Sequence, residues 1–81
     1  MKRPMHTYQC LLDNGQGGTT DLRAGSASAA LTRGIAWGKG GDWTYPLAFR
    51  VTVTNADDPR DTATALVEQD TRRGKAHVTY H

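Results

Sequence analysis

Apolar positions in the first half of the chain recur at helical spacing. Five of them follow at steps of three and four residues: Ala27, Ala30, Leu31, Gly34 and Ile35. This spacing places side chains on one face of an α-helix. Ser26 precedes the run as an N-cap, and Gly38 suits the left-handed residue that ends a helix. The pattern predicts a helix over 26–38, with a narrow stripe of small residues anchored by Leu31 and Ile35.

The segments on both sides of this helix alternate between apolar and polar residues, as strands buried on one face do. Predicted strands span 7–12 and 19–24 before the helix and 47–55 after it. Asn14-Gly15, between the first two strands, is a hairpin signal. In the third strand, Phe49, Val51 and Val53 face one way, and Arg50, Thr52 and Thr54 face the other. The polar outer face indicates an antiparallel sheet covered on one side only.

The segment 58–74 fits two structures. Pro59 suits the first turn of a helix. Residues 62–68, however, alternate as a strand does and are rich in β-branched threonine and valine. We favour the strand, with 55–61 as its hairpin loop and 76–81 as a short additional edge strand.

The resulting order is strand, strand, helix, strand, strand, with a fifth strand at the end. It predicts an α+β fold: an antiparallel sheet of four to five strands with one helix packed on one face, in ββαββ order. A chain of 81 residues has room for a single domain, 1–81. Pro4 discourages regular structure, so we expect 1–5 to be a flexible leader.

Charge and cysteine content narrow the classes of function. Ten Lys and Arg against eight Asp and Glu give a net charge of +2, which is too mild to indicate nucleic-acid binding by itself. The acidic cluster at 57–61 and the basic cluster at 72–75 are typical of solvated turns. Cys10 is the only cysteine, so a disulfide framework is excluded. No apolar segment follows Lys2 and Arg3 at the start of the chain, as it would in a signal peptide. No apolar segment is as long as a membrane span either, and we expect a cytoplasmic protein.

Candidate catalytic chemistry is weak. The run before Lys39 fails the phosphate-loop pattern, because Arg33 stands where its glycine belongs and Gly40 where its Ser or Thr belongs. His77 and His81 are four residues apart in an extended segment, with no third metal ligand nearby. We therefore expect no enzyme, no cofactor and no metal site.

Binding is the class of function that remains. The candidate partner-binding residues are the rings and cations at the helix end, in the loop after it and on the next strand: Arg33, Lys39, Trp43, Tyr45 and Arg50. Such a surface can stack on bases or anchor a protein interface. The alternative is that the rings cap the core and the arginines only keep the chain soluble.

The layout over 7–69 combines several short features. They are the Asn14-Gly15 turn, the alanine-rich helix entered through Ser26 and closed by Ala36-Trp37, the Gly41-Asp42-Trp43 step, and the Val51-Thr52-Val53-Thr54 hairpin with its acidic loop. In size and style the chain resembles the small phage-encoded anti-CRISPR proteins that inhibit type I effector complexes. No diagnostic motif matches position by position, so no functional residue is carried over.

The resemblance implies a stoichiometric inhibitor that occupies a protein surface of the effector complex (Cascade) in the host cytoplasm and blocks target DNA binding. It implies a protein partner, no catalytic residue and no membrane, and we expect a monomer. The mild positive charge argues against DNA mimicry. A small nucleic-acid-binding accessory protein of a phage or mobile element is the main alternative, and a structural phage component is a third.

Overall fold

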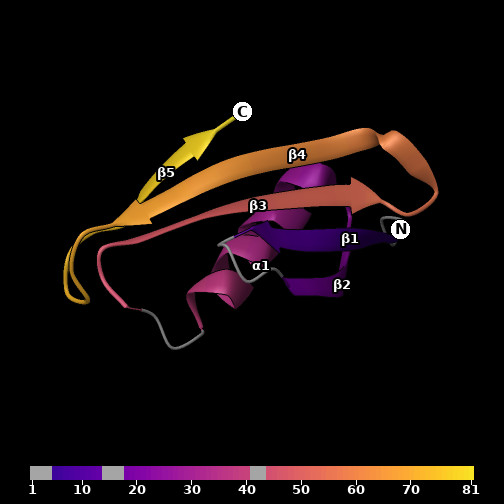
Figure 1. Cartoon of the computed structure of the whole chain (residues 1–81). Coiled ribbons are helices and arrows are strands. Elements are labelled where there is room, and N and C mark those ends of the chain that lie inside the picture. Colours follow the sequence, from indigo (N-terminus) through magenta and orange to yellow (C-terminus); the bar gives the residue numbers. More distant parts are fainter. Residues whose placement is uncertain (1–4, 14–17, 41–43) are drawn as a thin grey trace.

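The structure is a computed structural model that describes residues 5–13, 18–40 and 44–81. These residues form one helix and a five-stranded antiparallel sheet in the order β2-β1-β3-β4-β5 (Figure 1). Along the chain the elements are β1 (His6–Asp13), β2 (Gly18–Ala24), α1 (Ala27–Lys39), β3 (Leu47–Asn55), β4 (Asp58–Gln69) and β5 (His77–Tyr80). The predicted α+β class, the ββαββ order and the additional edge strand are confirmed. The Asn14-Gly15 turn and most of the expected leader lie outside the described residues.

The start of α1 follows the prediction, and its end does not. The Ser26 hydroxyl accepts a hydrogen bond from the Ala29 N–H at 3.2 Å, as expected of an N-cap. The helix continues through Lys39, and Gly40 ends it in a right-handed conformation with φ of −76°. The prediction of Gly38 as a left-handed cap is therefore wrong.

Gly38 instead permits close packing. A Cβ atom at this position would lie 2.8 Å from Cε2 of Phe49, inside the distance that real Cβ atoms keep. Gly34, one turn earlier, is equally crowded: its Cβ would lie 2.9 Å from both the Cys10 Sγ and a Val51 methyl group. The two glycines thus let the helix backbone approach the sheet closely.

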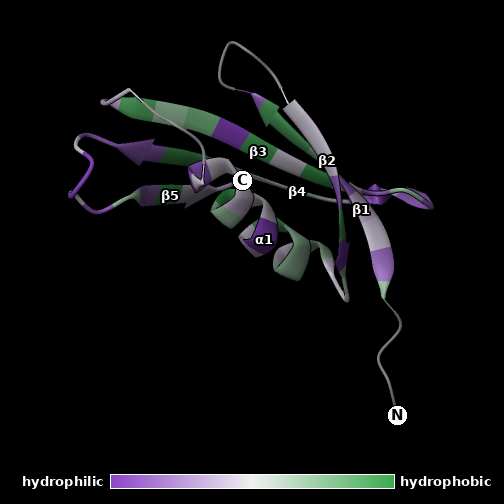
Figure 2. Cartoon of the chain, turned by 90° about the horizontal axis from the view of Figure 1, so that it is seen from below, coloured by the Kyte–Doolittle hydropathy of each residue, from purple (hydrophilic) through white to green (hydrophobic). Residues whose placement is uncertain are grey.

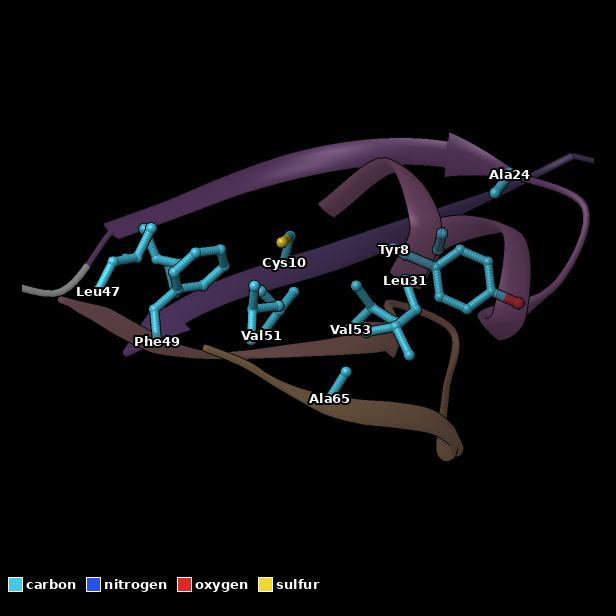
Figure 3. Packing of buried hydrophobic residues seen from close by; sticks show 12 residues of the cluster. Tyr8, Cys10, Ala24, Leu31, Leu47, Phe49, Val51, Val53 and Ala65 are labelled. Carbon is cyan, nitrogen blue, oxygen red and sulfur yellow. The ribbon is translucent and has the colours of Figure 1, made fainter. Parts of the chain in front are cut away.

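The hydrophobic core lies between α1 and one face of the sheet, here called the inner face. Twelve buried apolar residues form it: Tyr8, Cys10, Leu12, Ala24, Ala30, Leu31, Leu47, Phe49, Val51, Val53, Ala65 and Val67. Figure 3 shows the β3 side chains pointing toward the same space as Cys10 and Leu31. Leu31 is a buried anchor as predicted, whereas Ile35 is only partly buried.

The segment after β3 is a strand, which excludes the helix alternative. The predicted hairpin loop over 55–61 is too long, because β4 already begins at Asp58 and only 56–57 form the turn. The Asn55 side-chain oxygen accepts a hydrogen bond from the Asp57 N–H at 2.9 Å and so closes this turn. The register shifts between Thr54 and Asn55, which brings the ladder into line with the short turn.

One member of the acidic cluster is part of the fold, contrary to the prediction of a solvated turn. The Tyr8 hydroxyl donates a hydrogen bond of 2.5 Å to Asp61 Oδ2, and the Asn55 amide donates to the same oxygen at 3.2 Å. The hydrogen bond to Asp61, together with burial, raises the pKa of Tyr8. The hydrogen bonds from Tyr8 and then Asn55 lower the pKa of Asp61. This contact joins β1 to the start of β4.

Among the described residues, α1 covers one face of the sheet. α1 packs against β1, β2, β3 and β4 and, within the described ranges, makes no contact with β5. All five strands lie on one side of the helix (Figure 2). No helix in the described part of the chain is long and apolar enough to cross a membrane. The opposite face, here called the outer face, is not covered by any element of the described ranges.

Candidate binding surface

The described residues do not assemble a metal-binding cluster. In 5–13, 18–40 and 44–81, no three His, Cys, Asp or Glu side chains lie close enough together to hold a metal ion. Cys10 is fully buried below α1, and desolvation raises the pKa of its thiol. A neutral, inaccessible thiol is a packing residue, since thiolate is the nucleophile.

Arg33 and Lys39 lie on the exposed side of α1. Arg33 is engaged within the fold, because its Nη1 donates a hydrogen bond of 2.8 Å to the carbonyl oxygen of Arg23 in β2. Lys39 is in the last helical turn, where a cation interacts favourably with the helix dipole. Lys39 thus remains open to a partner, whereas Arg33 ties the helix to the sheet edge.

The predicted aromatic residues divide in a similar way. Trp43 lies outside the described residues. Tyr45 is partly buried and packs against the core cluster, so much of its ring is used by the fold. Trp37, near the end of α1, is 39% exposed, and its ring lies near Gly18 at the start of β2.

Arg50 does not lie on the same face as Arg33 and Lys39. Its neighbours Phe49 and Val51 are buried on the inner face, so strand alternation directs Arg50 to the outer face. The structure therefore divides the predicted binding residues between two sides of the sheet.

The outer face is built around a threonine ladder on β3 and β4. The hydroxyls of Thr52 and Thr64 lie 3.2 Å apart, and those of Thr54 and Thr62 are also 3.2 Å apart. Thr62 donates in addition to the Val53 carbonyl at 2.8 Å. Directly opposed threonines stabilise an antiparallel pair and leave a flat, hydroxyl-lined surface.

A shallow hollow opens beside this ladder. It has a volume of about 370 Å³ and is lined by Arg50, Thr52, Thr64 and His81. The register sets Leu11 next to Thr52 along one row of the sheet.

The next row adds a second leucine. There Arg50 stands between Asp13 on β1 and Leu66 on β4. Leu11 is 50% exposed, and Leu66 is partly buried. We call the group Leu11, Arg50, Thr52, Thr64, Leu66 and His81 the outer patch.

The chemistry of the outer patch is mixed. It combines aliphatic surface with one guanidinium group and two hydroxyls on regular, paired strands, and with the imidazole of His81 directly after β5. Arginine and apolar side chains together are typical of protein interfaces. Among the described strands, no Phe, Tyr or Trp ring projects from the outer face, because Tyr8 and Phe49 are buried within the core and the register places Tyr80 opposite the inner-face Ala65. The imidazoles of His77 and His81 are the aromatic rings that the described residues present on this face.

The chain matches no protein-family model, no curated protein and no solved structure.

Most of the outer patch was missed in the sequence. Arg50 and Thr52 were assigned to the correct face, but Leu11, Thr64 and His81 received no role. One signal was available, since Leu11 is an apolar residue on the otherwise polar face of its strand. The proximity of Thr64 and His81 follows from strand pairing, which the chain order alone does not reveal.

Proposed function

We propose that this protein is a stoichiometric inhibitor that binds a subunit of a type I CRISPR effector complex and prevents target DNA from loading. The choice of partner rests on the resemblance in layout described above. The mode of action rests on the outer patch, where the half-exposed Leu11 lies on a rigid sheet near the hollow beside Arg50. Such an inhibitor acts in the bacterial cytoplasm.

The composition of the outer face favours a protein partner over nucleic acid. Proteins that bind single strands on a sheet stack bases on exposed aromatic rings, most strongly on Phe, Tyr and Trp. The described outer face has none of these three and presents only the smaller imidazoles of His77 and His81. Its charges are also mixed, since Asp13 neighbours Arg50 across the strands and Glu68 follows on β4. An aliphatic and hydroxyl surface with a single arginine suits a protein surface of complementary shape.

Co-elution tests the proposal. The purified chain is mixed with a type I effector complex at micromolar concentration, and the mixture is separated by size exclusion. We expect a complex that no longer shifts target DNA in a gel. Leu11→Asp and Arg50→Glu should each weaken the interaction at least about tenfold, as expected for central interface residues.

Arg72→Glu is the matched control, because Arg72 is equally exposed but lies in the turn between β4 and β5, outside the outer patch. Absence of co-elution of the unmodified chain would contradict the proposed partner. Equal binding by all three variants would contradict the proposed surface.

Direct binding of nucleic acid remains the alternative function. It predicts that the isolated chain retards DNA or RNA in a gel and that this binding weakens steeply with salt. Retardation at low salt without effector binding would favour the accessory-protein function.

A further inference from the structure

The open edges of the sheet are protected to different degrees. An exposed strand edge presents unpaired N–H and C=O groups to other chains, and proteins usually block it with charges, proline or a covering side chain. Within the described ranges, three stretches of strand have an unpaired side: β2 at one edge of the sheet, and the first half of β4 followed by β5 at the other.

The β2 edge is capped at one position and carries two charged residues, Asp21 and Arg23. The Ala56 N–H donates to the Thr7 carbonyl at 2.9 Å, so the odd residues of β1 bond toward β3 and the even ones toward β2. By the β1–β2 register, the backbone groups of Arg23 then point to the open edge. This is the carbonyl oxygen that Arg33 caps at 2.8 Å.

The first half of β4 is protected by its composition. Pro59 lacks an N–H and interrupts pairing. Asp58 and Arg60 on either side form an ion pair of 3.3 Å at the surface. A second strand pairing here would have to displace these charges.

The β5 edge lacks charged side chains, proline and a covering element among the described residues, and its short length of four residues is its one protection. The His81 N–H donates to the Thr64 carbonyl at 2.9 Å, so the odd residues of this strand bond toward β4. The backbone groups of Val78 and Tyr80 consequently point to the open edge. The strand His77–Tyr80 contains no proline, glycine, lysine, arginine or carboxylate, and α1 does not contact it in the described structure. The Tyr80 side chain is 66% exposed.

We propose that β5 pairs antiparallel with β5 of a second copy of this chain, joining the two sheets edge to edge. The register in which Val78 and Tyr80 both bond to the second copy places Thr79 at the two-fold axis. It sets Val78 opposite Tyr80 of the second copy on the inner face, and Thr79 opposite Thr79 of the second copy on the outer face. β-branched residues opposite aromatic ones, and threonine opposite threonine, are favourable cross-strand pairs.

The sequence of β5 is the reason for choosing a second copy as the occupant. The strand is complementary to itself about Thr79 and carries no Lys, Arg, Asp or Glu, so two copies approach without repulsion between charges of that kind. Four residues give a contact smaller than the roughly 1,200 Å² at which stable interfaces begin. The dimer is therefore weak and forms at high concentration, in place of the monomer expected from the sequence. The dimer does not depend on the proposed function, because it forms through the backbone edge of β5, whereas the proposed function uses the side chains of the outer patch.

Charge reversal at the two-fold axis tests the dimer. Sedimentation of the full chain from about 10 μM to about 1 mM should show a mass rising toward that of a dimer. Thr79→Lys and Thr79→Glu should each remain monomeric, because like charges would be directly opposed. An equimolar mixture of these two variants should associate again. Thr19→Lys, which adds the same charge at an exposed position of β2, should associate like the unmodified chain.

Amide hydrogen exchange locates the contact. Protection of Val78 and Tyr80 should increase with protein concentration in the unmodified chain and not in Thr79→Lys. A monomer at about 1 mM, or equal association of Thr79→Lys and the unmodified chain, would overturn the proposal. Thermal melts of the variants confirm that each is folded.

Discussion

The two faces of the sheet are made from the same strands, but one is buried in the core and the other is exposed. On the inner face, Phe49 and Val51 exclude water beneath α1, and Gly34 lets the helix approach. On the outer face, the hydroxyls of Thr52 and Thr64 hydrogen-bond to each other while remaining accessible. Stability is therefore concentrated on the inner face, and the outer face is left available for binding.

The largest test of this contrast compares two leucines. Leu31→Ala should cost about 2 to 5 kcal/mol, because it opens a cavity in a core that has few large side chains. Leu11→Ala, which removes the same atoms from the outer face, should cost less than about 1 kcal/mol. Urea unfolding of both variants measures the difference, and equal losses would show that the outer face is also part of the core.

The next test adds a carbon atom to α1 at the point where the helix contacts the inner face. Gly34→Ala should destabilise by about 1 to 3 kcal/mol, because the new Cβ would crowd the Cys10 sulfur at 2.9 Å and force the helix outward. Gly40→Ala is the matched control: its Cβ would meet nothing closer than 3.4 Å, and its φ of −76° suits any residue. An unchanged urea midpoint for Gly34→Ala would contradict the close approach of the helix.

A third test concerns the rim of the core, where Tyr8 meets Asp61. Tyr8→Phe should lower the melting temperature by several degrees near neutral pH, because it removes a hydrogen bond to a charged group. Tyr80→Phe, at an exposed side chain, should leave the melting temperature nearly unchanged.

The effect of Tyr8→Phe should depend on pH. The pKa of Asp61 is lowered from 3.8, so its stabilisation is present above about pH 4 and is lost as the pH falls further. The pKa of Tyr8 is raised from 10.0, so its stabilisation is present below about pH 10 and is lost as the pH rises through the higher value. The difference between the unmodified chain and the variant should therefore be largest between these limits. A difference that is constant across the range would contradict the Tyr8 to Asp61 contact.

The smallest expected effect lies in the threonine ladder. Thr52→Val and Thr64→Val remove one hydroxyl each from a pair 3.2 Å apart on the open face. A double-mutant cycle should give a coupling energy of about 0.2 to 1 kcal/mol. Zero coupling would show that the two hydroxyls do not stabilise the pairing.

Local patterns predicted the elements well. Strand alternation gave the bounds of β3 as they stand, and the N-cap at Ser26 located the start of α1. The end of α1 was misjudged because Gly38 was assigned a local role, whereas its lack of a side chain serves a contact with Phe49. The predicted loop over 55–61 is longer than the turn at 56–57, because the charged residues of 58–61 resemble a loop in the sequence while their backbone belongs to β4.

The candidate site was harder to predict. Strand alternation predicts Arg50 on the outer face. That Arg33 and Lys39 lie on the opposite side of the sheet could not be predicted, because it depends on which face the helix covers. Tyr8 and Asp61 are 53 positions apart in the chain, so no local pattern relates them. The same holds for Thr64 and His81 in the hollow.

Apart from 58–74, which fits two structures, the amino-acid sequence determined which segments become helix or strand and which face of each is apolar, since these depend on periodicity and end signals among neighbouring residues. The tertiary structure alone decided that β1 lies between β2 and β3, that Asp61 receives the Tyr8 hydroxyl, and that β5 keeps an uncovered edge. These features depend on contacts between distant segments, whose geometry is set only when the helix and sheet bury their apolar faces together.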